Sequence, residues 1–585
     1  MLVSRVRFAA VVSALSVAVL SCVLADRPIL DTDYFWHLRT GALIAETGSV
    51  PRVDPFSYSA PGAPWIDLHW LFQLALHQLH AWGGHAATRT AGLALGLLVV
   101  AVSAAALWRS DRPAVSGGAL ALLATTAALR FVLRPDTVSL LLAAIVLALL
   151  RRDERRNDAW VFAIVPVQLL WSNVHGFQAV GLAFVAMALA AEGMAPWLGA
   201  RRARRPDRVR RLALVLALAA AAALANPNGV SGALLPIRQL GMIGPAETRG
   251  IFGQAIDELR SPLAALEPSR APALLAFAAL AILSGVALAL DRRHASVFDA
   301  LVWAGALCLA LAAVRNVALF AVAAAPIFAV HFGRWLDEGS SIPRAHQRAF
   351  GAAVLAALAV AAGAAAAWDA ARAQRSHGAS DPALADFWFP ERGVDWIAAH
   401  RPPGPLYHRS GDGGYLIWRL WPAYPVLVDG RLEVYGERLY EEIEVAGGGG
   451  PDTFVNLDAR YHFGTALVHF GLFRDLSLFA WLLAQPDWRL VEVDEVAAVF
   501  VRAGAATDWP AVNPASPVLF EPLDPESRDP MDLWRRKSRI SLLTLFGRFA
   551  DARALLRETR ARYDDPVLHR MEELLAQAPD GSAAR

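Results

Sequence analysis

Acidic and imidazole side chains lie close together in the polar segment that follows the first apolar run. Asp31, Asp33 and His37 are separated by a single residue or by one helical turn. If a helix begins near Asp33, its carboxylate and the His37 imidazole share one face at positions i and i+4. Such a pair can act as a general base or help to hold a divalent cation. The alternative is that Asp31 or Asp33 caps this helix by accepting hydrogen bonds from its free N–H groups.

Basic side chains at short breaks between apolar runs could bind an anion. Arg134 comes just before Pro135-Asp136, and Arg315 lies in a break of almost no length. A guanidinium group matches phosphate oxygens with a planar fork of donors and keeps its charge at any relevant pH. The alternative is that these arginines extend outward to lipid headgroups, which fits Arg130 well and Arg315 less well. We therefore predict phosphate contacts for Arg134 and Arg315, with Asp136 beside them.

Three further polar residues are candidates for the same site. His175 interrupts an apolar stretch, and turn chemistry explains it less completely than it explains Asn226–Gly229. His69 belongs to residues 65–80, whose helical pattern has one polar face. The alternative for His69 is a polar side chain at headgroup depth in an interfacial helix. Asp54 lies farther along the loop that begins with Asp31.

The composition indicates the kind of molecule that must position these residues. The chain has 585 residues, of which 56% are hydrophobic and 18% charged, with a mean hydropathy of +0.38. These values exclude a disordered chain, a fibrous protein and an ordinary soluble enzyme. The net charge of +2 gives no indication of nucleic-acid binding. Cys22 and Cys308 lie in apolar runs, so we expect neither a disulfide framework nor a cysteine-based metal site.

The apolar runs predict a polytopic helical membrane protein. A helix needs about 20 apolar residues to cross a bilayer. We identify eleven candidate spans, at 6–25, 86–108, 114–132, 137–150, 159–173, 176–194, 212–225, 271–290, 296–314, 316–332 and 349–368. The spans at 137–150 and 212–225 are short. The predicted transmembrane module covers residues 1–368 and includes a long first loop at 26–85 with juxtamembrane helices.

The distribution of arginine predicts the orientation. With the N-terminus in the cytoplasm, the cytoplasmic segments hold twenty arginines, twice as many as the longer loops on the other side. An odd number of spans then places the C-terminal part in the periplasm or outside a bacterial cytoplasmic membrane. Val23-Leu24-Ala25 would be an acceptable signal-peptidase site, but the length of the apolar run favours an uncleaved span. The candidate site residues then all lie at the outer boundary, where charged groups default to functional roles.

Strand and helix patterns alternate after the last span. They predict a periplasmic α/β domain at 369–505, a proline-rich linker at 506–530 and a helical hairpin cap of tetratricopeptide type at 531–585. Within the α/β domain we predict helices at 391–400, 413–421, 436–445, 453–461 and 473–485, and strands at 405–408, 425–428, 465–470, 488–494 and 496–502. The glycine-rich segment Gly411–Tyr415 lacks nucleotide-binding spacing and is interpreted as a loop or turn.

The membrane part resembles the GT-C superfamily of integral-membrane glycosyltransferases. Asp31-Thr32-Asp33-Tyr34-Phe35-Trp36-His37-Leu38-Arg39-Thr40-Gly41 and Asp54-Pro55-Phe56-Ser57-Tyr58 are similar to the acidic first outer loop of that family. Leu133-Arg134-Pro135-Asp136 is similar to its second acidic position. The resemblance covers the α/β domain by position only. The Trp-Trp-Asp motif of asparagine-linked oligosaccharyl transfer is not found in the soluble domain, so that reaction is not expected.

The resemblance implies transfer of a sugar from a polyprenyl-phosphate donor to an acceptor hydroxyl on a glycan, lipid or protein. Asp31 or Asp33, with His37, would then act in catalysis. Arg134, Asp136, Arg315, His175, Asp54 and His69 would bind the substrate or its phosphate. A divalent cation, Mg²⁺ or Mn²⁺, would be held by Asp33 or Asp136. Two alternatives stay open: a non-catalytic membrane scaffold of the cell envelope, and a glycan polymerase or ligase that uses lipid-linked sugars.

Overall fold

A computed structural model describes most of the chain. The described residues are 2–109, 111–194, 205–239, 256–265, 270–373, 383–385, 388–445, 450–470, 476–505, 509–517, 519–524 and 530–577. Their contacts divide the chain into two compact units. The first, called here the membrane unit, comprises Met1–Arg27, Thr40–Val50 and Ile66–Ala370. The second, called here the C-terminal unit, comprises Pro28–Arg39, Pro51–Trp65 and Ala371–Arg585.

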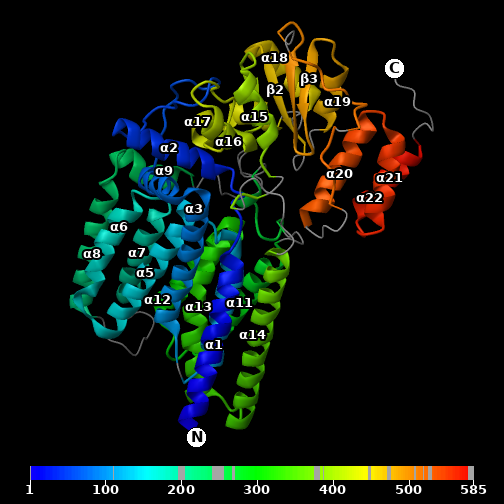
Figure 1. Cartoon of the computed structure of the whole chain (residues 1–585). Coiled ribbons are helices and arrows are strands. Elements are labelled where there is room, and N and C mark those ends of the chain that lie inside the picture. The colour runs from blue at the N-terminus through cyan, green and yellow to red at the C-terminus, as the bar shows by residue number, and fades with distance from the viewer. Residues whose placement is uncertain are drawn as a thin grey trace. The chain divides into compact units, whose positions relative to one another are not determined.

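The regular elements in the described part of the membrane unit are all helices (Figure 1). Its main helices are α1 (Leu2–Ala25), the second half of α2 (Asp33–Thr47), α3 (Trp70–Leu107), α4 (Pro113–Ala127), α5 (Pro135–Arg156), α6 (Ile164–Trp171), α7 (Gln178–Met194), α8 (Pro206–Leu224), α9 (Gly229–Gln239), α11 (Ala271–Leu290), α12 (Val297–Ala312), α13 (Val317–Arg334) and α14 (Arg344–Ala373). Short helices at the breaks are η1 (Ala128–Arg130), η2 (Ala159–Ala163), η4 (Asp257–Leu259), η5 (Val314–Asn316) and η6 (Trp335–Gly339).

All eleven predicted spans coincide with helices, but fewer of these helices are long and apolar enough to cross a membrane. Five meet both conditions in the described residues: α1, α3, α11, α13 with its flanking turns, and α14. A sixth would be α8 with α9, two helices that bend by 106° at a short break. The segments 159–171, 178–194 and 297–312 are apolar but shorter. The count of eleven spans therefore stays a prediction.

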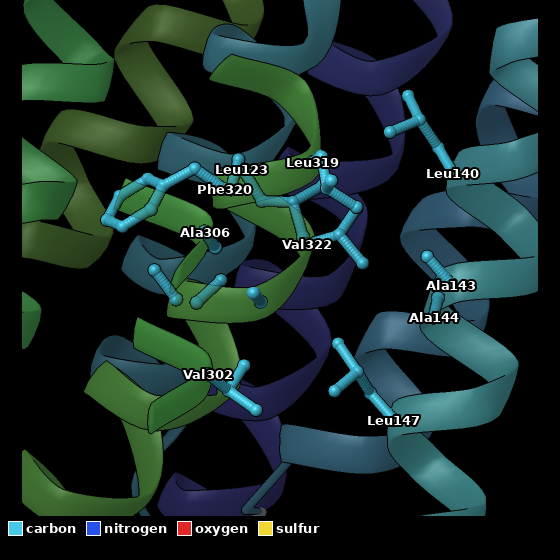
Figure 2. Close-up of a cluster of buried hydrophobic side chains, with 14 of the residues drawn as sticks. Leu123, Leu140, Ala143, Ala144, Leu147, Val302, Ala306, Leu319, Phe320 and Val322 are labelled. Atoms are coloured by element: carbon cyan, nitrogen blue, oxygen red, sulfur yellow. The ribbon is translucent and has the colours of Figure 1, made fainter. Parts of the chain in front are cut away.

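Helix α13 forms the centre of the membrane unit. In its apolar window, 89% of the residues are buried, against 6% in α14. Figure 2 shows part of the apolar cluster around α13, in which Leu319, Phe320 and Val322 pack near Val302 of α12 and near side chains of α4 and α5. Small residues such as Ala306 in this cluster let the helices approach closely. The apolar layer separates polar groups at the two ends of the same helices.

One of these polar ends contains a network of buried ion pairs. The Arg151 guanidinium of α5 lies 2.8 Å from the Asp299 carboxylate of α12. The His331 ring of α13 lies between two carboxylates, with Nδ1 2.7 Å from Asp291 and Nε2 3.0 Å from Asp299. The predicted topology places this end at the cytoplasm. Since α5 and α13 run from Asp136 and Arg315 toward Arg151 and His331, the candidate arginines lie at the other end.

The C-terminal unit contains a four-stranded mixed sheet with the order β1-β2-β4-β3. The strands are β1 (Leu406–Tyr407), β2 (Thr465–His469), β3 (Trp488–Val493) and β4 (Ala497–Arg502). β1 pairs with β2 in parallel, and the other pairs are antiparallel. The accompanying helices are α15 (Glu391–His400), α16 (Ser410–Leu420), α17 (Leu432–Tyr440), α18 (Pro451–Tyr461) and α19 (Leu476–Ala484), with η7 at Glu441–Val445. The α/β prediction is confirmed.

Two local predictions in this unit are wrong. Residues 425–428 do not form a sheet strand, because Val426 exchanges backbone hydrogen bonds with Phe56 and Tyr58 of the first loop. The glycine-rich segment 411–415 is not a loop but the first part of α16. Cβ atoms at Gly413 and Gly414 would collide with the carbonyl oxygens of Val428 and Thr32, respectively. These glycines therefore permit close packing and do not make a turn.

The C-terminal unit also includes two stretches of the first loop, Pro28–Arg39 and Pro51–Trp65, and a group of C-terminal helices. Ile29 forms a single bridge with Leu384. The C-terminal helices are α20 (Pro530–Leu545), α21 (Phe549–Arg560) and α22 (Pro566–Ala576), which share a small apolar core of their own. The predicted hairpin is thus a set of three helices, and its tetratricopeptide character stays a prediction. The predicted linker lies partly outside the described residues.

Candidate functional site

Two arginines of the membrane unit are positioned by the turn between α4 and α5. Arg130 ends η1, and Arg134 comes directly before Pro135, the first residue of α5. A residue before proline avoids helical geometry, and Arg134 has extended torsions of φ −130° and ψ 157°. The chain therefore turns sharply here, and both guanidinium groups reach the same carboxylate. That carboxylate belongs to Glu258 of η4.

Glu258 binds both arginines. Its oxygens lie 3.1 and 2.9 Å from the two terminal nitrogens of Arg130, a bidentate pair, and 2.7 Å from Nη1 of Arg134. Asp136 adds a second carboxylate 3.2 Å from Arg130. Burial alone would raise the pKa of Glu258, but the charges and hydrogen bonds of Arg130 and Arg134 hold that pKa well below its ordinary value. The carboxylate is therefore ionised at neutral pH.

Arg315 has a different environment in the same cluster. It lies in η5, half-buried, with its guanidinium carbon 5.5 Å from the centre of the Phe177 ring. The charges of Arg130, Arg134, Glu258 and Asp136 all act on it. Within the described residues, Arg315 makes no salt bridge, and its buried Nε atom has no acceptor. Among the described residues, Glu258 and Asp136 pair with Arg130, and Glu258 also pairs with Arg134, whereas neither carboxylate pairs with Arg315.

His175 connects this cluster to the first turn of α3. Its Nδ1 lies 2.8 Å from the Ser139 hydroxyl, which is also 2.8 Å from the indole nitrogen of Trp171. The His175 ring lies 4.7 Å from the Phe177 ring and 5.4 Å from the His69 ring, measured between centroids. His69 in turn has its Nδ1 3.6 Å from the buried Asp67 carboxylate. Five predicted residues of the membrane unit, His69, Arg134, Asp136, His175 and Arg315, therefore belong to one connected group.

The structure corrects one prediction and adds one residue to this group. Arg130 does not extend to lipid headgroups, because it is 5% exposed and paired with both Glu258 and Asp136. Glu258 was visible in the sequence as an acidic residue of an outer loop. Its role as the common partner of two arginines was not predictable, because more than 120 residues separate it from both of them.

The three predicted catalytic residues lie in the first loop, within the C-terminal unit. Helix α2 begins at Asp33, whose backbone N–H donates to the Asp31 carboxylate at 3.0 Å. Asp31, which is 9% exposed, therefore makes the kind of hydrogen bond that the helix-capping alternative predicts. The Asp33 carboxylate is more accessible and accepts a hydrogen bond from the indole of Trp36 at 3.0 Å. His37 is buried beside Trp36. Their predicted catalytic roles stay predictions.

Asp54 lies in a buried ionic cluster of the C-terminal unit. Its carboxylate is 2.8 Å from the Arg431 guanidinium, which also binds both oxygens of Asp429 at 2.8 and 2.6 Å. The guanidinium lies between the rings of Phe56 and Trp65. Burial would raise the pKa of Asp429, but Arg431 lowers it below its ordinary value. These contacts give Asp54 a structural task, and its predicted contact with substrate stays a prediction.

The predicted cation ligands do not share a unit, since Asp33 belongs to the C-terminal unit and Asp136 to the membrane unit. Across the described residues, no three His, Cys, Asp or Glu side chains are grouped so that they could hold a metal ion. Asp136 has one oxygen on Arg130 and another that is buried without a hydrogen-bond partner in the described part of the chain. A cation at Asp136 would therefore need oxygens from a substrate, as Mg²⁺ commonly does.

Comparisons with known proteins give limited similarity. No family model matches the chain, and no curated protein matches it. A solved structure of the oligosaccharyltransferase AglB from Archaeoglobus fulgidus, in complex with an inhibitory peptide and a dolichol-phosphate, is similar with a TM-score of 0.49 and 12% identity, over 85% of this chain and 75% of that one. The apo form of an oligosaccharyltransferase from the same organism gives a TM-score of 0.46 with the same identity and coverage.

Proposed function

We propose that this protein is a membrane glycosyltransferase that moves a sugar from a polyprenyl-phosphate donor to an acceptor hydroxyl. In this proposal it works on the outer face of a bacterial cytoplasmic membrane. The observation that carries the proposal is the arginine cluster of the membrane unit, in which Arg315 lacks a carboxylate partner among the described residues. A half-buried guanidinium that no described carboxylate pairs with is costly in a membrane protein unless an anion binds beside it.

A lipid phosphate is the anion that fits this position best. The cluster lies at one end of an apolar helical bundle, where the headgroup of an amphiphile would lie while its chain stays among apolar side chains. Arg315 and Arg134 would bind phosphate oxygens through their planar forks. Glu258 limits the total charge and fixes Arg130 and Arg134 in position. During transfer, negative charge grows on the leaving phosphate, and preorganised guanidinium groups would stabilise that charge.

The acceptor hydroxyl needs a base, and we assign this role to Asp33. The carboxylate would remove the hydroxyl proton while the hydroxyl oxygen bonds to the anomeric carbon. The bond from that carbon to the phosphate oxygen breaks, and its electron pair leaves with the prenyl phosphate. Asp33 is preferred to Asp31 because it is the less buried of the two. The GT-C resemblance of the first loop supports the same assignment.

A transfer assay tests this proposal. Membranes that contain the full chain would receive radiolabelled polyprenyl-phosphate sugar prepared from the expression host. The labelled glycan or lipid product would then be measured. We expect Asp33→Asn to abolish the product without lowering the amount of protein in the membrane. Glu437→Gln, a change at an exposed carboxylate of α17, is the matched control and should leave the product unchanged.

Asp31→Asn separates the two carboxylates of the loop. If Asp33 is the base, this variant should keep part of the activity while it weakens the start of α2. Undiminished product in the Asp33 variant would remove the assignment of Asp33, and undiminished product in both variants would remove the catalytic role of this loop. The chain would then be better described by the alternative of a non-catalytic scaffold.

A further inference from the structure

A chain of hydrogen bonds that the proposed reaction does not use ends at His175. The indole nitrogen of Trp171 lies 2.8 Å from the Ser139 hydroxyl oxygen. An indole can only donate, so this oxygen accepts the Trp171 hydrogen. The hydroxyl of Ser139 has one hydrogen to give, and two acceptors are near. His175 Nδ1 lies at 2.8 Å and the carbonyl oxygen of Pro135 at 3.3 Å, so geometry favours His175.

This arrangement determines which nitrogen of His175 carries the hydrogen. If Ser139 donates to Nδ1, then Nδ1 is an acceptor and the hydrogen of the neutral ring is on Nε2. Burial lowers the pKa of His175 well below its ordinary value, and the positive charges of Arg315, Arg130 and Arg134 act in the same direction, so the ring stays neutral. Ser139 is 1% exposed and Trp171 is fully buried, so both partners are held firmly by their surroundings.

The Nε2 atom lies on the side of the ring that faces away from Ser139. In the described part of the chain, the His175 ring makes no hydrogen bond other than the one to Ser139. The ring packs beside Phe177, and Arg315 lies over the same Phe177 ring. His175 and Arg315 therefore flank one aromatic side chain, and each has a donor that no described residue accepts.

We infer that the Nε2–H of His175 donates to the phosphate bound at Arg315, and that Ser139 and Trp171 are positioning residues that select this tautomer. The inference rests on the proposed phosphate site and extends it by a neutral donor. A neutral N–H binds a phosphate oxygen without adding to the positive charge of the cluster. The ligand class is a phosphate monoester or diester whose apolar part lies along the helical bundle.

Two substitutions of His175 separate this role from a structural one. The amide nitrogen of glutamine can occupy the place of Nε2, whereas that of asparagine can occupy the place of Nδ1. A donor role predicts that His175→Gln keeps binding within about threefold and that His175→Asn weakens it at least about tenfold, since hydrogen bonds to charged groups contribute about 1.5–3 kcal/mol. A purely structural contact with Ser139 predicts the opposite order.

The experiment titrates farnesyl phosphate into the full chain in dodecyl maltoside micelles and follows the heat of binding. Ser139→Ala should weaken binding by several-fold, and Ser139→Thr, which keeps the hydroxyl, should restore it. Size-exclusion elution and thermal unfolding check that each variant is folded. Equal affinities of the Gln and Asn variants, or the reverse order, would overturn the inference.

Additional variants and competitors distinguish rejection of the His175 role from rejection of the proposed function. If Arg315→Gln abolishes binding while both His175 variants bind normally, the phosphate site stands and the role of His175 is rejected. If the unchanged protein does not bind farnesyl phosphate, both proposals are rejected. Phosphatidylglycerol and inorganic phosphate are used as competitors. Displacement by phosphatidylglycerol at equal concentration would keep the donor role but assign the site to a phospholipid headgroup, against the proposed transferase.

Discussion

At the scale of single residues, Arg130 and Arg315 belong to one cluster but have different tasks. Arg130 is bound by two carboxylates, whereas Arg315 has none among the described residues. The first arrangement stabilises the fold, and the second is available to a ligand. Replacing either residue with glutamine should therefore separate stability from binding.

We expect Arg130→Gln to lower the free energy of unfolding by about 2–4 kcal/mol. This value is below that for a fully buried pair, because the Glu258 side chain is 42% exposed. Arg315→Gln should not lower the free energy of unfolding and should reduce binding of farnesyl phosphate at least about tenfold. Thermal unfolding in micelles and binding calorimetry measure the two effects. Equal loss of stability in both variants would contradict the distinction.

Removal of divalent cations tests the proposed role of Asp136. We expect a chelator to stop sugar transfer and added Mg²⁺ or Mn²⁺ to restore it. Asp136→Asn should raise the cation concentration needed for half-maximal activity, because one carboxylate oxygen without a hydrogen-bond partner among the described residues is the ligand offered to a substrate-bound cation. Activity that is indifferent to the chelator would contradict the predicted cation and leave the arginines as the phosphate partners.

The sequence predicts which residues belong to the site better than it predicts which residues form ion pairs with one another. Arg134, Asp136, His175 and Arg315 are visible because polar side chains interrupt apolar runs, which is costly without a reason. Glu258 is an ordinary loop residue in the sequence. Its ion pairs depend on tertiary packing between segments that are far apart in the chain, and no local pattern encodes that packing.

At the scale of elements, the turn between β3 and β4 contains an unusual carboxylate. Asp494 accepts hydrogen bonds from the backbone of Val496 and Ala497, each at 2.8 Å. Burial raises the pKa of Asp494 to about 6, although these backbone hydrogen bonds act in the opposite direction. The folded state thus holds this proton more tightly than the unfolded state, in which the pKa is about 4. Ionisation of Asp494 therefore lowers stability as the pH rises through this interval.

The expected consequence is a pH-dependent effect of Asp494→Asn. Asparagine keeps an oxygen for both backbone donors but does not ionise. Relative to the unchanged protein, the variant should gain stability between about pH 4 and pH 6 and keep a constant gain above that, up to roughly 3 kcal/mol. Tryptophan fluorescence during thermal unfolding from pH 4 to 8 measures it, with Glu437→Gln as control. A gain that is the same at every pH would show that ionisation is not its cause.

Helices and strands could be predicted where the local pattern determines them. Apolar runs and alternating patterns located the helices of the membrane unit and all four sheet strands, each strand end to within one residue. The prediction of a sheet strand at 425–428 was wrong because the hydrogen-bond partners of this segment lie in the first loop. The prediction of a loop at 411–415 was wrong because its glycines permit close packing inside a helix. Glycines that serve this purpose look the same in the sequence as glycines that make a turn.

At the scale of the whole molecule, sidedness is the assumption on which the proposed function depends. The orientation comes from the arginine distribution, and it places the Arg315 cluster outside and the His331 network inside. Single cysteines can test it after Cys22 and Cys308 are replaced by alanine. Ser49 and Arg293 are exposed positions in loops at opposite predicted faces of the membrane unit.

We expect a membrane-impermeant maleimide to label Ser49→Cys on intact spheroplasts. Arg293→Cys should be labelled only after permeabilisation of the membrane. Equal retention of both proteins in the membrane fraction serves as the control. Labelling of the Arg293 variant alone on intact spheroplasts would reverse the topology and place the arginine cluster at the cytoplasmic face, against the proposal.

The division into units was the least predictable feature. The sequence predicts a boundary at the last span, whereas two stretches of the first loop belong to the C-terminal unit. The Asp54–Arg431 pair and the backbone contacts of Val426 join these stretches to residues late in the chain. Such pairing follows from tertiary burial, and the local sequence of the loop contains no sign of its partner.

The most direct measurement of the central claim is a comparison of lipid-linked and surface glycans in cells with and without this protein. Mass spectrometry of both pools would be made in the deletion strain and after complementation. The proposed transferase predicts that deletion accumulates a polyprenyl-phosphate sugar and removes the same sugar from a surface glycan or lipid, and that the unchanged protein, but not Asp33→Asn, reverses both changes. Identical pools in all strains would contradict it.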